Sequence, residues 1–152
     1  MLTAWRMVPL PHTADAFTGE GARLFGGRWN SAGVPLVYCS STVSLATLET
    51  LVHINPQLPR QYMLYEVRFD ASLVEEISLV KIPSGWDTEP PGPASMSIGD
   101  EWVRAARSVV LGVPSVLTRE KNYLLNPRHK DFRRVKIGPG APFSFDPRLL
   151  KK

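Results

Sequence analysis

Proline is the feature that most restricts how this chain can fold. The 152 residues include 14 prolines, nearly twice the average share of about 5%. Because each proline fixes φ and lacks an amide donor, the chain should favour turns and short strands over long helices. No apolar run approaches the ~18 residues of a membrane-spanning helix, and residues 1–17 lack the continuous apolar stretch of a signal peptide.

The composition is that of an ordinary globular protein. Hydrophobic residues make up 43% of the chain and charged residues 21%, which excludes a disordered chain, a coiled coil and a collagen-like fibre. The length predicts a single domain over residues 1–152. The one cysteine, Cys39, cannot form an internal disulfide, which favours the cytoplasm. The net charge of +4 would attract anions, or it only keeps the surface soluble.

Hydrophobic periodicity predicts more strands than helices, in an irregular order that favours an α+β fold. The two expected helices span residues 41–54, capped by Ser41 or Thr42 and stopped by Asn55-Pro56, and residues 98–111, between Ser97 and Gly112. Loops are expected at 13–27 and 82–97. Strands are expected at 4–8, 35–40, 61–69, 74–80, 113–118, 132–137 and 143–145.

The first expected helix carries an acidic residue close to its apolar face. Leu45, Leu48 and Val52 lie at helical spacing and should face the core, and Glu49 lies at the edge of that stripe. A carboxylate there is costly unless it is paired or faces a cleft. The residues alone leave two interpretations open: a boundary or paired structural glutamate, or a site residue.

The segment Gly26-Gly27-Arg28-Trp29-Asn30 combines a flexible backbone with an arginine. Its guanidinium can bind a phosphate or carboxylate through two donors, and Trp29 offers a flat ring for stacking. A glycine-rich turn with a surface arginine is the alternative. Ser115, in an apolar strand, needs a partner or faces a pocket.

Other chemistry has weaker support in the sequence. The three histidines are scattered and Cys39 has no partner cysteine, so no metal site is predicted. Basic residues alternate with Phe132 over 128–136. This pattern is typical of a solvated edge strand, and it also suits a nucleic-acid-binding or RNA-cleaving protein. We expect the edge strand.

Together these pieces resemble the RES domain, the toxin half of RES–Xre toxin–antitoxin modules. The resemblance extends over nearly the whole chain, through residues 5–6, 26–30, 37–38, 44–49, 99–102, 113–115, 122–129 and 145–148. The arginine, glutamate and serine that name the family fall at Arg28, Glu49 and Ser115.

The resemblance implies a fold similar to ADP-ribosyltransferase toxins, in which small mixed or antiparallel sheets and flanking helices form a cleft. It implies an NAD⁺ glycohydrolase or phosphorylase that releases nicotinamide and passes ADP-ribose to water or phosphate. A protein acceptor is the alternative. NAD⁺ is then a substrate, phosphate a candidate co-substrate, and no cofactor is needed. The expected partner is an Xre-type helix-turn-helix antitoxin that blocks the active site, and a homodimer within that complex is allowed.

The family pattern assigns catalytic roles to four residues: Arg28, Tyr38, Glu49 and Ser115. Cleavage of the nicotinamide–ribose bond develops positive charge on the ribose, which the carboxylate of Glu49 would stabilise. Arg28 would hold the diphosphate, Tyr38 would pack on or orient the nicotinamide ribose end, and Ser115 would bind substrate or orient Glu49. Further substrate contacts are assigned to Arg6, Trp29, Asn126 and His129.

Overall fold

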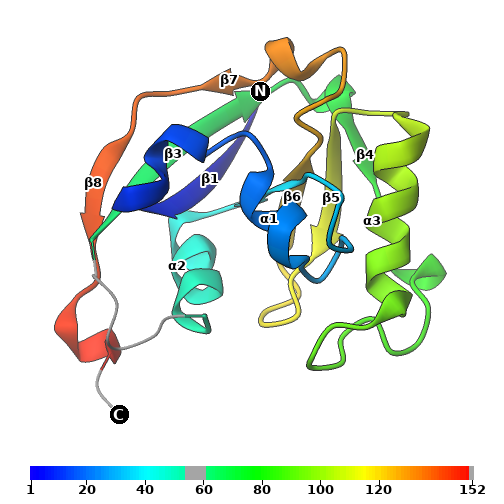
Figure 1. Ribbon diagram of the computed structural model, residues 1–152, viewed down its shortest axis with the longest axis horizontal. Coiled ribbons are helices and arrows are strands. Elements are labelled where there is room, and N and C mark those ends of the chain that lie inside the picture. The colour runs from blue at the N-terminus through cyan, green and yellow to red at the C-terminus, as the bar shows by residue number, and fades with distance from the viewer. Residues whose placement is uncertain (54–60, 151–152) are drawn as a thin grey trace.

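The computed structural model describes residues 1–53 and 61–150 of the chain. One twisted mixed sheet organises it (Figure 1). The strands are β1 (Leu2–Pro9), β2 (Val37–Ser40), β3 (Gln61–Phe69), β4 (Val74–Glu76), β5 (Val110–Pro114), β6 (Lys121–Leu125), β7 (Lys136–Ile137) and β8 (Ala141–Ser144). The α-helices are α1 (Glu20–Phe25), α2 (Val43–Leu51) and α3 (Pro93–Ala105). The 3₁₀ helices are η1 (Leu10–Asp15), η2 (Ala71–Leu73), η3 (Leu79–Lys81), η4 (Phe132–Arg134) and η5 (Pro147–Leu150).

The strand order is β4-β5-β6-β2-β1-β3-β7, with β8 also paired to β3. β4 and β5 run parallel, and the other pairs are antiparallel. The α+β class predicted from the sequence is confirmed. Among the described helices, none is long and apolar enough to cross a membrane.

Each face of the sheet has its own hydrophobic cluster, because successive side chains of a strand point to opposite faces. In β2 and β6, Val37, Cys39 and Leu125 face a cluster that includes β1 and β3. Leu124 faces the other cluster, which contains the aromatic rings of Trp29 and Trp102. The register pairs Tyr38 with Leu124 and Ser40 with Asn122, which puts these polar side chains on the second face.

The predicted strand at 61–69 is confirmed to the residue as β3, and the strands at 4–8 and 35–40 are confirmed with small shifts as β1 and β2. The helix at 41–54 is shorter, since α2 ends at Leu51. The predicted Asn55-Pro56 stop lies outside the described residues. The expected core stripe of this helix was wrong: Leu48 and Val52 are 43% and 58% exposed. α2 buries Leu45 and Ala46 instead.

The second predicted helix was displaced. α3 begins at Pro93, inside the predicted loop, because proline is well tolerated in the first turn of a helix. It ends before Ala106, which adopts a left-handed conformation with φ of 53°. The predicted terminator, Gly112, lies in β5 opposite Tyr123.

Four other predictions need correction. The predicted loop at 13–27 contains α1, which only six residues form, too few for helical periodicity to show. The predicted strands at 74–80 and 132–137 each divide into a 3₁₀ turn and a short strand. The strand predicted at 113–118 begins at Val110 and ends at Pro114, where the hairpin turn starts. β6 was not predicted.

Candidate active site

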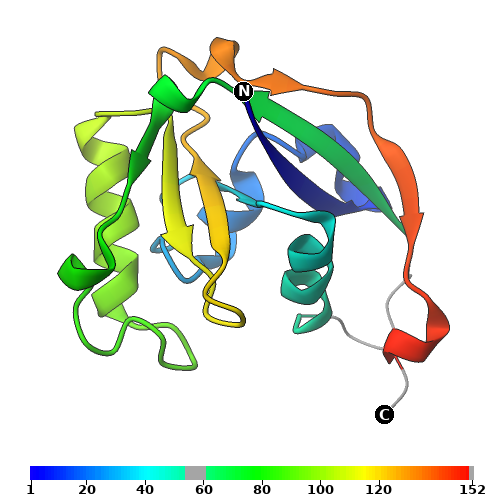
Figure 2. The same ribbon diagram turned by 180° about the vertical axis from the view of Figure 1, so that it is seen from behind.

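Helix α2 presents Glu49 to the β5–β6 hairpin, beside which it lies (Figure 2). The helix begins after Thr42, whose hydroxyl accepts a hydrogen bond from the amide of Leu45 at 3.0 Å. Leu45 and Ala46 are buried, and Glu49 follows them by four and three residues. Residues at these spacings share one helix face, so the face that packs inward also carries the carboxylate.

The hairpin turn supplies Ser115 as the first partner of Glu49. Its hydroxyl donates to Glu49 Oε1 at 2.6 Å and accepts from the amide of Leu117 at 3.1 Å. The Ser115 amide donates to the carbonyl of Glu120 at 2.7 Å, which closes the turn. Since a hydroxyl has one proton, the bond from Leu117 leaves that proton for the carboxylate. The structure therefore brings together Glu49 and Ser115, as an orienting role for Ser115 requires.

Asn122, on β6, is the second partner; it opens the family block 122–129, but the sequence analysis assigned it no role. Its Nδ2 donates to the same oxygen, Glu49 Oε1, at 3.1 Å. Asn122 is 9% exposed, and its Oδ1 is buried without a hydrogen-bond partner in the described part of the chain. The block itself does not reveal the contact with Glu49, because only the pairing of β6 with β2 and β5 turns Asn122 towards α2.

A second set of contacts shapes the arginine loop, which we define as residues 26–31. Tyr38 donates its hydroxyl proton to Asn30 Oδ1 at 2.6 Å and accepts from the amide of Trp29 at 3.0 Å. Asp100, on α3, accepts from the amide of Ser31 at 2.8 Å. Gly99 lets the helix approach, since a Cβ there would lie 1.7 Å from the carbonyl oxygen of Trp29. The arginine loop is thus fixed by both the sheet and α3.

Arg28 projects from this loop towards the segment that precedes α3. Its Nη1 donates to the carbonyls of Trp86 and Thr88 at 3.1 and 2.7 Å. Its Nη2 donates to Glu89 Oε2 at 2.8 Å. The Arg28 side chain is only 14% exposed, whereas that of Glu89 is 76% exposed. An acidic side chain therefore already occupies one donor position of the predicted anion-binding group.

Two predicted substrate contacts lie elsewhere. Trp29 is 2% exposed and its ring stacks on Trp86, with 5.8 Å between centroids, so it offers no free face for a substrate. Arg6 lies with Cys39 on the opposite face of the sheet from Tyr38 and binds the backbone carbonyls of Ala16 and Tyr38. The sequence could not reveal these positions, since they depend on strand parity and on the packing of residues 82–92.

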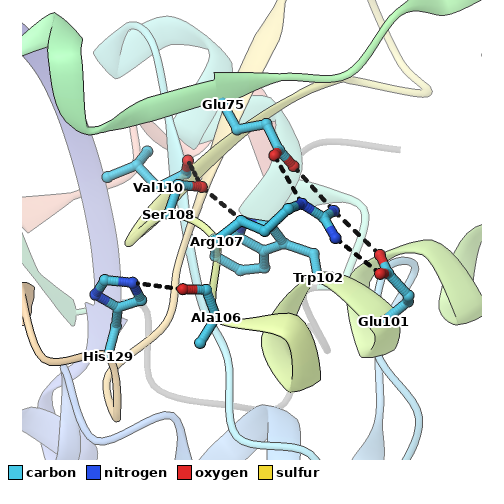
Figure 3. A network of polar contacts seen from close by, with 8 residues as sticks. All are labelled: Glu75, Glu101, Trp102, Ala106, Arg107, Ser108, Val110 and His129. Atoms are coloured by element: carbon cyan, nitrogen blue, oxygen red, sulfur yellow. Dashed lines mark hydrogen bonds and ion pairs between the residues drawn. The ribbon is translucent and has the colours of Figure 1, made fainter.

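Asn126 and His129 stabilise the turn that follows β6. Asn126 Oδ1 accepts from the amide of Arg128 at 3.1 Å. His129 Nδ1 accepts from the amide of Asp131 at 2.9 Å, which leaves the proton on Nε2, 3.0 Å from the carbonyl of Ala106. Figure 3 shows this last contact beside the ion pairs at the end of α3. Both ring nitrogens thus have backbone partners, so we assign His129 no substrate contact.

Burial governs the titration of two residues of β2. It raises the pKa of the Tyr38 phenol, which therefore keeps its proton for the bond to Asn30. Burial also raises the pKa of the Cys39 thiol to about 12, so the protonated, unreactive thiol predominates at neutral pH. In the described ranges, no three His, Cys, Asp or Glu side chains gather as metal ligands would.

The two halves of the candidate site share one face of the sheet. Asn122 and Tyr38 are diagonal neighbours on β6 and β2, which corresponds to a separation of about 7 to 8 Å. Asn122 donates a hydrogen bond to Glu49, which Ser115 also contacts. Tyr38 accepts one from the amide of Trp29 in the arginine loop. Two surface hollows of about 450 and 350 Å³ lie elsewhere, and neither is lined by Glu49 or Arg28. The first is lined in part by Arg133, Arg134 and Lys136 of the basic segment.

Comparison with known proteins decides the family. The chain matches the RES domain over residues 3–146. This protein belongs to the RES domain family. Its RES domain is 38% identical over 155 residues to a protein of Sphingobium sp. (strain YBL2) named Prs ADP-ribosylating toxin, covering 97% of this chain and 96% of the relative. It is 40% identical over 149 residues to Toxin Res of Yersinia enterocolitica, covering 95% of this chain and 97% of the relative.

The fold of this RES domain also has a solved counterpart. The crystal structure of the M. tuberculosis MbcT-MbcA toxin-antitoxin complex contains a chain that superposes with a TM-score of 0.77. The match covers 94% of this chain and 84% of that one, at 16% sequence identity. At that identity the likeness is one of fold.

Proposed function

We propose that this RES domain is the toxin of a toxin–antitoxin module and an enzyme that cleaves the nicotinamide–ribose bond of NAD⁺, transferring ADP-ribose to phosphate or water. The arrangement of Glu49 carries the proposal. Two neutral donors hold its Oε1, and no described residue hydrogen-bonds its Oε2. The names of the Sphingobium and Yersinia relatives support the toxin and ADP-ribose parts.

The chemistry requires little more than a well-placed carboxylate. When the bond between the ribose carbon and the pyridinium nitrogen breaks, its electron pair leaves with nicotinamide, which becomes neutral. Positive charge develops on the ribose, and the Glu49 carboxylate stabilises it. A phosphate dianion can attack that carbon directly. Attack by water releases a proton, which Glu49 can accept.

Arg28 would bind the diphosphate of NAD⁺. Arginine presents two parallel donors that match phosphate oxygens, and the Glu89 carboxylate already occupies one donor position with an anionic oxygen. Because the Glu89 side chain is mostly exposed, its ion pair with Arg28 contributes little stability. A diphosphate can therefore replace Glu89 at modest cost.

The proposed partner is an Xre-type helix-turn-helix antitoxin that covers the site. The solved counterpart of this fold is a toxin bound to an antitoxin, which supports a protein partner of that kind.

A protein acceptor for ADP-ribose is the second candidate, favoured by one relative. The Sphingobium protein is named as a Prs ADP-ribosylating toxin and aligns along almost the whole chain. The donor chemistry at Glu49 is the same in both cases, so the two candidates differ only in the nucleophile.

The test is nicotinamide release from NAD⁺ by the purified protein, measured by chromatography with and without phosphate. We expect release from the wild type, acceleration by phosphate if phosphate is the acceptor, and loss of about 100-fold or more in kcat for Glu49→Gln. Glu120→Gln, an exposed glutamate in the turn of the same hairpin, is the matched control and should stay active.

Two outcomes would decide against parts of the proposal. An intact NAD⁺ pool after prolonged incubation with folded wild-type protein would reject NAD⁺ cleavage. Label from adenine-labelled NAD⁺ that appears on a protein, and not in small products, would select the protein acceptor.

A further inference from the structure

We infer that Asn122 is a positioning residue that, with Ser115, fixes the Glu49 carboxylate so that Oε2 is the oxygen turned to the reacting ribose. The inference rests on the proposed function and gives a role to a residue of the block 122–129 to which the family pattern assigned none.

The two donors act on one oxygen. Ser115 Oγ and Asn122 Nδ2 lie 2.6 and 3.1 Å from Glu49 Oε1. Within residues 1–53 and 61–150, Oε2 has no hydrogen-bond donor. A carboxylate held at one oxygen by two donors from a hairpin cannot rotate without breaking both bonds. Its second oxygen therefore keeps a defined direction.

The orientation of the Asn122 amide follows from the carboxylate. Turning the amide over would place Oδ1 against Glu49 Oε1, two acceptors with no proton between them. Nδ2 must therefore face Glu49. This leaves Oδ1 buried without a partner in the described chain, a costly arrangement for a polar atom. The Asn122 amide thus keeps its hydrogen bond to Glu49 although its own oxygen lacks a hydrogen-bond donor in the described chain.

Two further asparagines that the structure describes as buried show what a structural role looks like in this molecule. Asn30 donates to the backbone carbonyls of Ala22 and Val34. Asn126 accepts from the backbone amide of Arg128. The side chain of Asn122, by contrast, hydrogen-bonds the side chain of Glu49 and, within the described residues, no backbone group. That difference separates a residue that orients the carboxylate from residues that shape loops.

The experiment compares steady-state NAD⁺ cleavage by wild type, Asn122→Ala, Asn122→Asp, Ser115→Ala and the Asn122→Ala/Ser115→Ala double variant. Tyr123→Phe is the matched control, because Tyr123 is the next residue of β6 and faces the opposite cluster. For Asn122→Ala we expect kcat to fall about tenfold while KM changes little.

Asn122→Asp is the discriminating variant. It preserves the shape of the side chain but places a second negative charge against Glu49, which repels it. We expect its kcat to fall below that of Asn122→Ala, whereas a packing role would make the better-shaped aspartate the more active variant. The double variant should lose less than the product of the two single losses, since both donors hold the same oxygen.

Each result bears on a different claim. A wild type that releases no nicotinamide overturns the proposed function and this inference with it. If the wild type is active, three results would overturn this inference and leave the proposed function intact. They are a wild-type kcat for Asn122→Ala, a rise in KM alone for that variant, and a higher kcat for Asn122→Asp than for Asn122→Ala. Should Asn122→Asp fail to fold, as judged by its thermal melt, Asn122→Ala and the double variant still decide.

Discussion

Glu49 and Arg28, two charged residues at opposite sides of the candidate site, have very different surroundings. Glu49 is held by two neutral side chains on one hairpin, and its Oε2 has no hydrogen-bond partner among the described residues. Arg28 contacts two backbone carbonyls and an acidic side chain, all within residues 86–89. Under the proposed function, Glu49 has an oxygen free to face the ribose, whereas Arg28 would have to exchange the Glu89 carboxylate for the substrate diphosphate. Substitutions at Glu49 should thus change mainly kcat, and substitutions at Arg28 should change mainly KM.

Among substitutions around Arg28, Arg28→Ala should have the largest effect on substrate binding. Loss of two charge-assisted hydrogen bonds to a diphosphate corresponds to about 100-fold in KM, or ~2.7 kcal/mol. The value of kcat should change less, because Glu49 keeps its two donors. Steady-state kinetics of nicotinamide release measure both constants. A fall in kcat with constant KM would contradict the division of roles.

Gly99→Ala should disturb the arginine loop without touching Glu49. The added methyl group meets the carbonyl oxygen of Trp29, and such overpacking costs about 2 kcal/mol. Thermal or denaturant unfolding measures the loss. Gly21→Ala is the control, since a Cβ at Gly21 has no neighbour within 4 Å in the part of the chain described. Equal stability of the two variants would show that α3 does not fix the loop as tightly as the structure indicates.

Tyr38→Phe should have a smaller effect on the same loop. It removes the hydroxyl that joins Trp29 to Asn30, and leaving such partners unsatisfied costs about 1 to 2 kcal/mol of stability. KM should rise more than kcat falls. Because burial raises the pKa of this phenol, Tyr38 should ionise only above the usual pH range of tyrosine, and a titration of tyrosine absorbance should show one fewer residue ionising at high pH in the variant.

Glu89→Gln should have the smallest effect, and in the opposite direction. The glutamine still reaches Arg28 but lacks the charge that competes with a diphosphate. The ion pair is largely exposed on the Glu89 side and worth at most about 1 kcal/mol, so KM for NAD⁺ should fall no more than about fivefold. Asp15→Asn, an exposed acid outside the loop, controls for net charge. A higher KM for Glu89→Gln would mean that Glu89 supports binding.

The local sequence pattern predicted secondary structure correctly where residues of the segment itself carry the signal. Alternation over 61–69 predicted β3 to the residue, and Thr42, one of the two expected caps, begins α2. It failed where tertiary contacts decided the outcome. Leu48 and Val52 share the apolar spacing of Leu45, yet the short helix α2 buries only Leu45 and Ala46 against the sheet.

The sequence alone predicted the family and the α+β class, both confirmed, and it assigned Arg28, Tyr38, Glu49 and Ser115 to the proposed site. These conclusions depend on the identity and order of residues, which can be read from the sequence. Only the tertiary structure decided that Asn122 joins Ser115 on one oxygen of Glu49, and that Arg6 and Trp29 are directed away from the site. Strand register and parity control those outcomes, because a one-residue change of register moves every side chain of a strand to the other face of the sheet.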